Sequence, residues 1–217
     1  MKISVLLFSY IEDYKLNKLI KMKKTWIVLA VIAVLLLVAY SSIKGSYNNM
    51  VNMQEGVTAQ WSQVENVYQR RADLIPNLVS TVKGYAEFEK ETLTQVIEAR
   101  AKATAVNINP ANLDAQSIQK FQEAQSGLSS ALSKLMVVVE KYPDLKANLG
   151  FLDLQAQLEG TENRITVERM KFNESAQTYN TFIRQFPKNI WAGMFGFEKK
   201  AYFEAQEGAN KAPTVTF

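Results

Sequence analysis

The sequence predicts an all-α protein, in which a single N-terminal transmembrane helix is followed by an antiparallel, coiled-coil-like four-helix bundle. Three observations lead to this prediction. An uncharged apolar run covers residues 25–43, apolar residues recur at helical spacing through most of the remaining chain, and no stretch has the strict alternation of a half-buried strand. With 9 glycines and 5 prolines in 217 residues, the chain is also poor in the residues that punctuate β-rich folds.

The apolar run from Thr25 to Ile43 is long enough to cross a bilayer. At ~1.5 Å per residue, a helix over this run extends about 28 Å, close to the thickness of the hydrocarbon core. Trp26 and Tyr40 lie near its two ends, where aromatic rings favour the headgroup region. Two alternatives are a cleaved signal peptide, for which Ala39-Tyr40-Ser41 is a weak cleavage site, and a buried core helix, which would normally have a polar face.

The charge distribution predicts the orientation of this anchor. The first 24 residues hold six lysines and two acidic residues, which accounts for the whole net charge of +4. Because positive residues collect on the cytoplasmic side, we expect the N-terminus in the cytoplasm, the anchor in the cell (inner) membrane and the bundle outside the cytoplasm. The balanced remainder argues against nucleic acid as a partner.

The domain boundaries follow from these features. Residues 1–24 are predicted to be a short basic cytoplasmic leader, with Met22 as an alternative true start, and residues 25–43 are the transmembrane helix. The bundle is predicted over 44–197 and a C-terminal tail over 198–217.

Four prolines divide the bundle into four long segments that each carry an apolar stripe. The stripes of the first and third segments step by alternating 3 and 4 residues, which is the heptad pattern of a coiled-coil seam. Pro76 suits a first helical position, so a second helix is predicted from Pro76 to about Val106. A fourth, longer helix is predicted from about Asp144 to Phe186. Short connections imply an up-down-up-down bundle.

The composition excludes several kinds of chemistry. The chain has no His and no Cys, so it lacks the commonest general base, the commonest metal ligand and any thiolate nucleophile. It also lacks the glycine-rich phosphate loops and the common hydrolase motifs. Glutamates such as Glu159 recur on the helices, but di-metal sites in bundles use a Glu-x-x-His spacing. We therefore predict no catalytic residues, no metal and no cofactor.

Several charged residues are predicted to make structural contacts instead. The Arg70-Arg71-x-Asp73 cluster is interpreted as a tie between two helices at a turn, with an anion site as the alternative. Glu98 and Arg169 are predicted to lie at similar heights on neighbouring helices and to form an ion pair, joined by further charges. The candidate structural polar contacts are Arg70, Arg71, Asp73, Glu98, Arg100, Glu162 and Arg169.

Two segments near the C-terminus are candidate interaction sites. The stretch from Phe186 to Phe197 is aromatic and nearly uncharged, and an even number of antiparallel helices returns its end toward the membrane. The candidate membrane contacts are Trp191, Phe195 and Phe197, with closure of the base of the bundle as the alternative. The free Val-Thr-Phe end at Phe217 could add as a strand to a PDZ-type groove, unless it packs on the bundle or stays unbound.

The chain resembles the LemA family from the anchor onward. The resemblance rests most specifically on the block Arg70-Arg71-Ala72-Asp73-Leu74-Ile75-Pro76-Asn77-Leu78-Val79, and continues in Lys83-Gly84-Tyr85-Ala86, Tyr142-Pro143, Tyr179-Asn180 and Phe186-Pro187. It implies a bacterial single-pass membrane protein with a helical bundle and no known reaction. Some members of the family are linked to bacterial organelle membranes or envelope functions. Phe88 and Phe172 depart from the family pattern, where His and Tyr are frequent, which weakens any proton-transfer role.

These observations together predict a non-enzymatic scaffold or adaptor of the bacterial envelope. Its expected partners are the lipid bilayer and an unidentified envelope protein, and self-association is compatible with the seams. The alternative is a regulatory subunit or ligand of a membrane protease or sensor that acts through the C-terminal tail. A hydrolase would need a nucleophile and base pair that the sequence does not offer.

Overall fold

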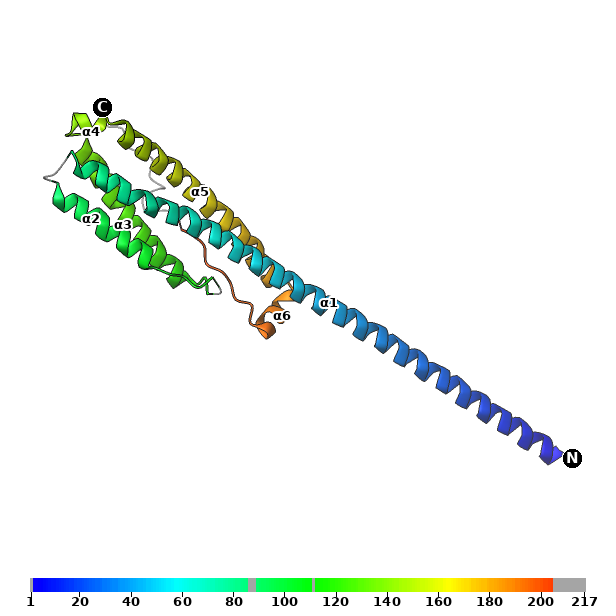
Figure 1. Cartoon of the computed structure of the whole chain (residues 1–217). Coiled ribbons are helices and arrows are strands. Elements are labelled where there is room, and N and C mark those ends of the chain that lie inside the picture. Colours follow the sequence, from blue (N-terminus) through cyan, green and yellow to red (C-terminus); the bar gives the residue numbers. More distant parts are fainter. Residues whose placement is uncertain (1, 86–88, 111, 205–217) are drawn as a thin grey trace, which may run out of the picture. The chain divides into compact units, whose positions relative to one another are not determined.

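All regular secondary structure in the described part of the chain is helical (Figure 1). The computed structural model describes residues 2–85, 89–110 and 112–204, and for residues 2–22 it describes only the helical backbone. The predicted all-α class is confirmed for these residues. The chain divides into two compact units, residues 1–49 and residues 50–217, which are described in turn.

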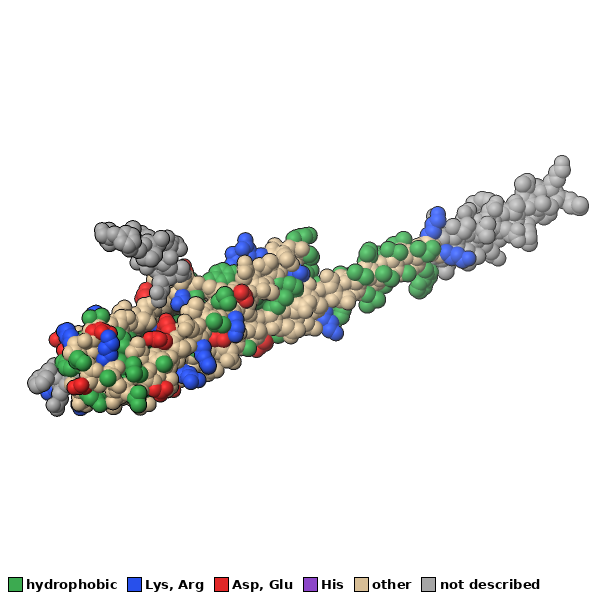
Figure 2. All heavy atoms as spheres, turned by 90° about the horizontal axis from the view of Figure 1, so that it is seen from above, with side chains coloured by type: hydrophobic (Ala, Val, Ile, Leu, Met, Phe, Trp, Pro, Cys, Tyr) green, Lys and Arg blue, Asp and Glu red, His purple; other side chains and the backbone are tan. Residues whose placement is uncertain are grey.

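The first unit is helical and contains the apolar run. It forms the beginning of helix α1 (Lys2–Lys83). The large apolar side chains between Trp26 and Tyr40 are 46–69% exposed, and Figure 2 shows hydrophobic side chains along both edges of this stretch. Within the described residues, this is the one helical stretch long and apolar enough to cross a membrane. Its composition and exposure fit a single-pass membrane anchor.

In its described residues, the second unit contains the remainder of α1 and five further helices. These are α2 (Lys90–Ala105), α3 (Ala115–Val139), α4 (Pro143–Lys146), α5 (Leu149–Arg184) and α6 (Lys188–Phe195). Two of them have side-chain caps, because the Asp114 carboxylate accepts from the Ser117 N–H at 2.7 Å and the Asn148 amide oxygen accepts from the Phe151 N–H at 2.9 Å. Gly196, with φ of 75°, ends α6 in the left-handed conformation that glycine adopts without strain.

The core of this unit consists of two apolar clusters. The first surrounds Trp61 of α1, Phe121 of α3 and Phe172 of α5. The second surrounds Leu78 of α1 and Leu128 of α3, and it also takes residues from α2, α4 and α5. Most seam residues of the first and third predicted helices therefore lie in the core, whereas Tyr47, where the first seam begins, is exposed.

The predicted helix boundary at Pro76 is wrong, because α1 continues through this proline to Lys83. Proline has no N–H, so the carbonyl of Ala72, four residues earlier, loses its partner within the helix. The Arg100 guanidinium of α2 donates its Nε–H to this Ala72 oxygen at 2.8 Å. A hydrogen bond from another helix thus replaces the one that Pro76 cannot make, and α2 begins only at Lys90.

Three other predicted boundaries differ from the structure. The fourth helix is divided into α4 and α5, since the Asn148 cap starts a new helix. The compact unit begins at Met50 and not at residue 44. The first residues of the predicted tail, 198–204, belong to this unit, because Phe203 is buried in the first cluster.

The hydrogen bond from Arg100 that compensates for Pro76 gives a testable prediction. Arg100→Met should lower the free energy of unfolding by about 1–3 kcal/mol, because the Ala72 carbonyl is left unpaired. In a Pro76→Ala background the same change should cost less than about 0.5 kcal/mol, since the alanine introduced at position 76 has an N–H that donates to the Ala72 carbonyl. Urea unfolding followed by circular dichroism measures both values, and equal costs in the two backgrounds would contradict this account.

Candidate functional site

A buried guanidinium lies at the centre of the second unit. Arg71 of α1 is 2% exposed, whereas the charged residues nearest to it in sequence, Arg70 and Asp73, face solvent. Its Nη1 donates to the Glu162 carboxylate of α5 at 2.8 Å and to the Ser129 hydroxyl of α3 at 3.0 Å. Its Nη2 donates to the Gln125 side-chain oxygen at 2.6 Å. One side chain thus joins three helices.

Gln125 extends this network of contacts to α2. Its Nε2 donates to the Ala103 carbonyl near the end of α2 at 3.3 Å, and Arg100 of α2 donates back to α1 at Ala72. We call Arg71, Gln125, Ser129, Glu162 and Arg100 the polar layer. A polar layer on α1, α2, α3 and α5 restricts how these helices can slide past one another.

The polar layer separates the two apolar clusters. Along α1 it lies between Tyr68 of the first cluster and Ile75 of the second. Along α3, Gln125 lies between Phe121 of the first cluster and Leu128 of the second. The Tyr68 ring also stacks beneath the guanidinium, with Arg71 Cζ 5.1 Å from the ring centre.

The other predicted polar residues lie elsewhere. Arg70 and Asp73 are exposed, and Asp73 accepts from the Gln69 amide at 2.8 Å, so the cluster lies in the middle of α1 and not at a turn. The predicted ion pair between Glu98 and Arg169 is wrong. Glu98 is exposed on α2, whereas the Arg169 guanidinium covers the Phe203 ring at 4.8 Å and donates to the Glu204 carbonyl at 2.9 Å.

Sequence reasoning missed two of the central residues. Gln125 was visible as a polar residue within the apolar seam of the third predicted helix, and that interruption was the available signal. Phe203 was placed in the tail, although an aromatic pair at 202–203 is unusual in an unstructured segment. Its ring stacks on Trp61 at 5.9 Å and meets Phe172 edge-on at 5.4 Å.

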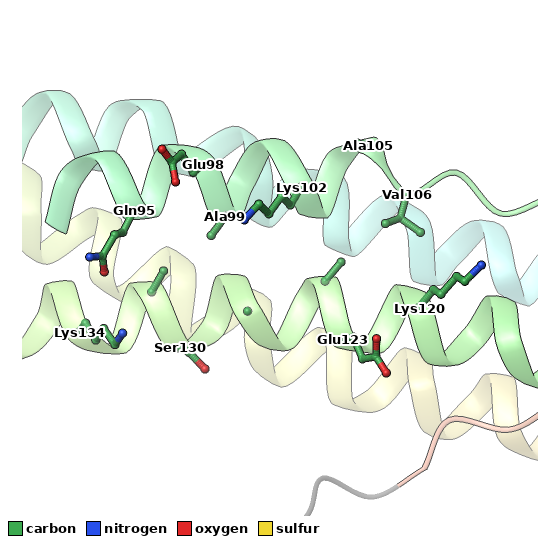
Figure 3. Close-up of a pocket in the computed structure, with 13 residues that line it drawn as sticks. Gln95, Glu98, Ala99, Lys102, Ala105, Val106, Lys120, Glu123, Ser130 and Lys134 are labelled. Atoms are coloured by element: carbon green, nitrogen blue, oxygen red, sulfur yellow. The ribbon is translucent and has the colours of Figure 1, made fainter. Parts of the chain in front are cut away.

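A groove of about 630 Å³ runs between α2 and α3 (Figure 3). Its floor is made by small side chains, among them Ala99, Ala124 and Gly127. Charged side chains stand along its two edges and change sign along its length: Glu98, Lys102, Lys120, Glu123 and Lys134. The lining residues of α3 extend from Lys120 to Lys134, which is about 21 Å at ~1.5 Å per residue, or about four helical turns.

The three predicted membrane contacts differ in exposure. Trp191 and Phe197 pack against the first cluster and are partly buried. Phe195 is more exposed, together with Ile190 and Met194 on the same helix. The side chains that face solvent are therefore mostly not the ones that the sequence singled out.

Burial shifts the pKa values of several side chains in the second unit. Burial raises the pKa of the Tyr179 hydroxyl to about 12, and burial also raises the pKa of Tyr68. Burial lowers the pKa of Lys200. In the described residues, no three acidic or other metal-ligating side chains gather in one place. The candidate strand-forming end at Phe217 lies outside the described residues, as does Phe88.

Comparison with known proteins identifies the relatives of this chain. The family model described as LemA family matches residues 60–217. Magnetosome protein MamQ 2 of Paramagnetospirillum magneticum is 29% identical over 206 residues, covering 87% of this chain and 75% of the relative. MamQ of Magnetospirillum gryphiswaldense is 29% identical over 203 residues, with 85% and 74% covered. Protein LemA of Metamycoplasma hominis is 24% identical over 163 residues, with 75% and 71% covered. The chain therefore belongs to the LemA family.

Proposed function

We propose that this protein is a membrane-anchored, non-catalytic adaptor of the bacterial envelope. In this proposal its four long helices act as an antiparallel bundle that offers a binding surface to another protein. The observation that carries the proposal is the open groove between α2 and α3, which has small residues on its floor and charges on its edges. Likeness to proteins named for the magnetosome supports a role as a component of a larger assembly.

The chemistry of the chain supports a non-catalytic role. It contains no His and no Cys, so a nucleophile would lack its usual activating partner. The buried polar groups are used between helices: Arg71 contacts Gln125, Ser129 and Glu162. The raised pKa of Tyr179 follows from burial in the core, where a substrate has no access. The shifted pKa of Tyr179 therefore reflects packing in the core.

The anchor would hold the second unit close to the lipid surface. We place the anchor in the inner membrane with the N-terminus in the cytoplasm, because the lysines precede the apolar run. The run ends at Ile43, and the second unit begins seven residues later at Met50. Within that unit α1 leads from Met50 to Lys83 beside α4, and Figure 1 shows α6 at the end opposite α4. We therefore propose that Ile190, Met194 and Phe195 rest on the bilayer.

The groove would receive a helix of the partner protein. Small side chains allow close approach of another backbone, and four turns match the length of a short amphipathic helix. The charges along the edges alternate in sign, so a complementary helix would carry alternating charges beside a narrow apolar or small-residue stripe. Such edge charges fix register and partner choice more than they add affinity.

The orientation can be tested because the chain has no native cysteine. Ser130 is exposed on α3. In the Ser130→Cys variant, a membrane-impermeant maleimide should therefore label the introduced thiol in intact spheroplasts. The Ser130→Cys signal should not rise after lysis, since the whole population faces outward. Labelling that requires lysis would place the second unit in the cytoplasm and contradict the proposal.

The groove can be tested by filling it. A Cβ on Gly127 would meet no atom within 4 Å, so Gly127→Phe should occupy the groove without disturbing the fold. A photo-reactive residue at Ser130 should give crosslinked adducts in native membranes, and Gly127→Phe should reduce them at least about tenfold.

The matched control is Gly160→Phe on α5, where a Cβ is equally unobstructed. This variant should retain the adducts, and both variants should keep the wild-type melting temperature to within a few degrees. If no adduct forms from position 130, or if adducts persist with Phe at position 127, the groove is not the partner site.

A further inference from the structure

The C-terminal segment Glu198–Glu204 lies against the helices as a bound peptide would. It has no helical structure, and in Figure 1 it leaves α6 and runs back along the helices as an extended trace. Its main chain is held by side-chain amides. The Asn180 amide donates to the Lys200 carbonyl at 2.8 Å and accepts from the Lys200 N–H at 2.9 Å.

Two further amides repeat this pairing. The Asn173 amide donates to the Phe203 carbonyl at 2.9 Å and accepts from the Phe203 N–H at 2.8 Å. Gln122 of α3 bonds the Glu204 main chain in the same two-way manner, at 3.1 and 3.4 Å. Each amide thus offers a donor and an acceptor to one residue, as a neighbouring strand does in a hydrogen-bonded pair.

The spacing of these amides matches an extended chain. Asn173 and Asn180 are seven residues apart on α5, which is about 10.5 Å along a helix. Lys200 and Phe203 are three residues apart, which is about 10 Å in an extended chain. The two repeats coincide, so α5 presents its amides in step with an extended peptide that runs in the opposite direction.

The Phe203 side chain anchors the segment in the core. Phe203 is 5% exposed and lies among Trp61, Phe121 and Phe172, with ring centres 5.4–6.4 Å away. On its outer side, the ring is covered by the Arg169 guanidinium, which also donates to the Glu204 carbonyl. Recognition therefore rests mainly on main-chain atoms and on the Phe203 ring, with the buried Lys200 side chain and the Tyr202 hydroxyl, which accepts from Asn180 at 3.0 Å, adding to it. These features do not depend on which molecule supplies the segment.

We propose that this surface, formed by Asn173, Asn180, Gln122 and the aromatic pocket, is a peptide-binding site that can also be filled by the same segment of a second copy of the chain. The segment of a neighbour fits by construction, because every bond made within one copy can be made identically between two. Gly196 provides a left-handed turn where the segment leaves α6. Anchoring in one membrane would raise the local concentration of neighbouring copies.

The peptide-binding site is separate from the groove between α2 and α3, and its exchange between copies would be a mode of self-association. Exchange would link copies through the ends of their chains, and occupation within one copy would compete with it. The strength of the link would then depend on how readily the segment leaves its own site.

The site is tested with a synthetic peptide of sequence Phe197–Glu204 that carries a fluorophore. Full-length protein with Phe203→Ala should bind this peptide at least about tenfold more tightly than the wild type, because its own segment no longer fills the pocket. Fluorescence anisotropy measures the affinity. Adding Asn173→Ala to the Phe203→Ala protein should weaken binding about tenfold, whereas adding Asn163→Ala, an exposed asparagine on the same helix, should not.

Circular dichroism checks that the Phe203→Ala protein remains folded, and Phe203→Leu, which keeps more of the volume, replaces it if it does not. Exchange between copies is tested by co-expressing tagged Phe203→Ala chain with untagged Asn173→Ala/Asn180→Ala chain. The tagged chain should retain the untagged one, while neither variant should retain its own kind. A folded Phe203 variant that ignores the peptide would overturn the site, and peptide binding without retention would overturn the exchange.

Discussion

The buried guanidinium of Arg71 is the interaction on which the arrangement of the helices depends. Burying a charge is costly unless it is hydrogen-bonded, and both Nη atoms of Arg71 donate to groups of α3 and α5, while its buried Nε has no hydrogen-bond partner among the described residues. These partners lie at one level of the second unit, so the helices must be aligned there for the bonds to form. The apolar clusters on either side would tolerate some sliding of seam residues, whereas the polar layer would not. Stability thus comes mainly from the clusters, and a unique alignment from the layer.

Much of the fold could be predicted from the sequence, because helical periodicity and an uncharged apolar run are local signals. The seam through Trp61 and the one through Leu128 both lie in the core. Prediction failed where a distant residue decides a local outcome. Pro76 lies inside α1 because Arg100, from another helix, supplies the missing hydrogen bond. The ion pair expected for Arg169 rests only on its position along its helix. That position does not reveal that residues 198–204 fold back onto the helices, where Arg169 contacts Phe203 and Glu204.

The second unit offers contacts of three different kinds on different elements. The exposed apolar side chains of α6 are proposed to rest on lipid, the groove between α2 and α3 is proposed to receive a helix, and the amides of α5 hold an extended segment. None of these surfaces needs a reactive group. A rigid polar layer in the middle of the unit would keep the surfaces in a fixed relation to one another, which is what the proposed adaptor role requires.

The central claim, that the polar layer fixes the alignment of the helices, is tested most directly by a distance measurement across it. Spin labels at Ser80→Cys on α1 and Ser130→Cys on α3 report the alignment in a chain without other cysteines. In the Arg71→Leu/Gln125→Leu variant, the helical content and melting temperature should be retained or increased, because apolar residues replace a buried charge. The account predicts that the distance distribution from pulsed electron resonance becomes broad or multimodal. If the variant gave a distance distribution as narrow as that of the spin-labelled chain with Arg71 and Gln125 intact, at the same mean distance, the account would be contradicted.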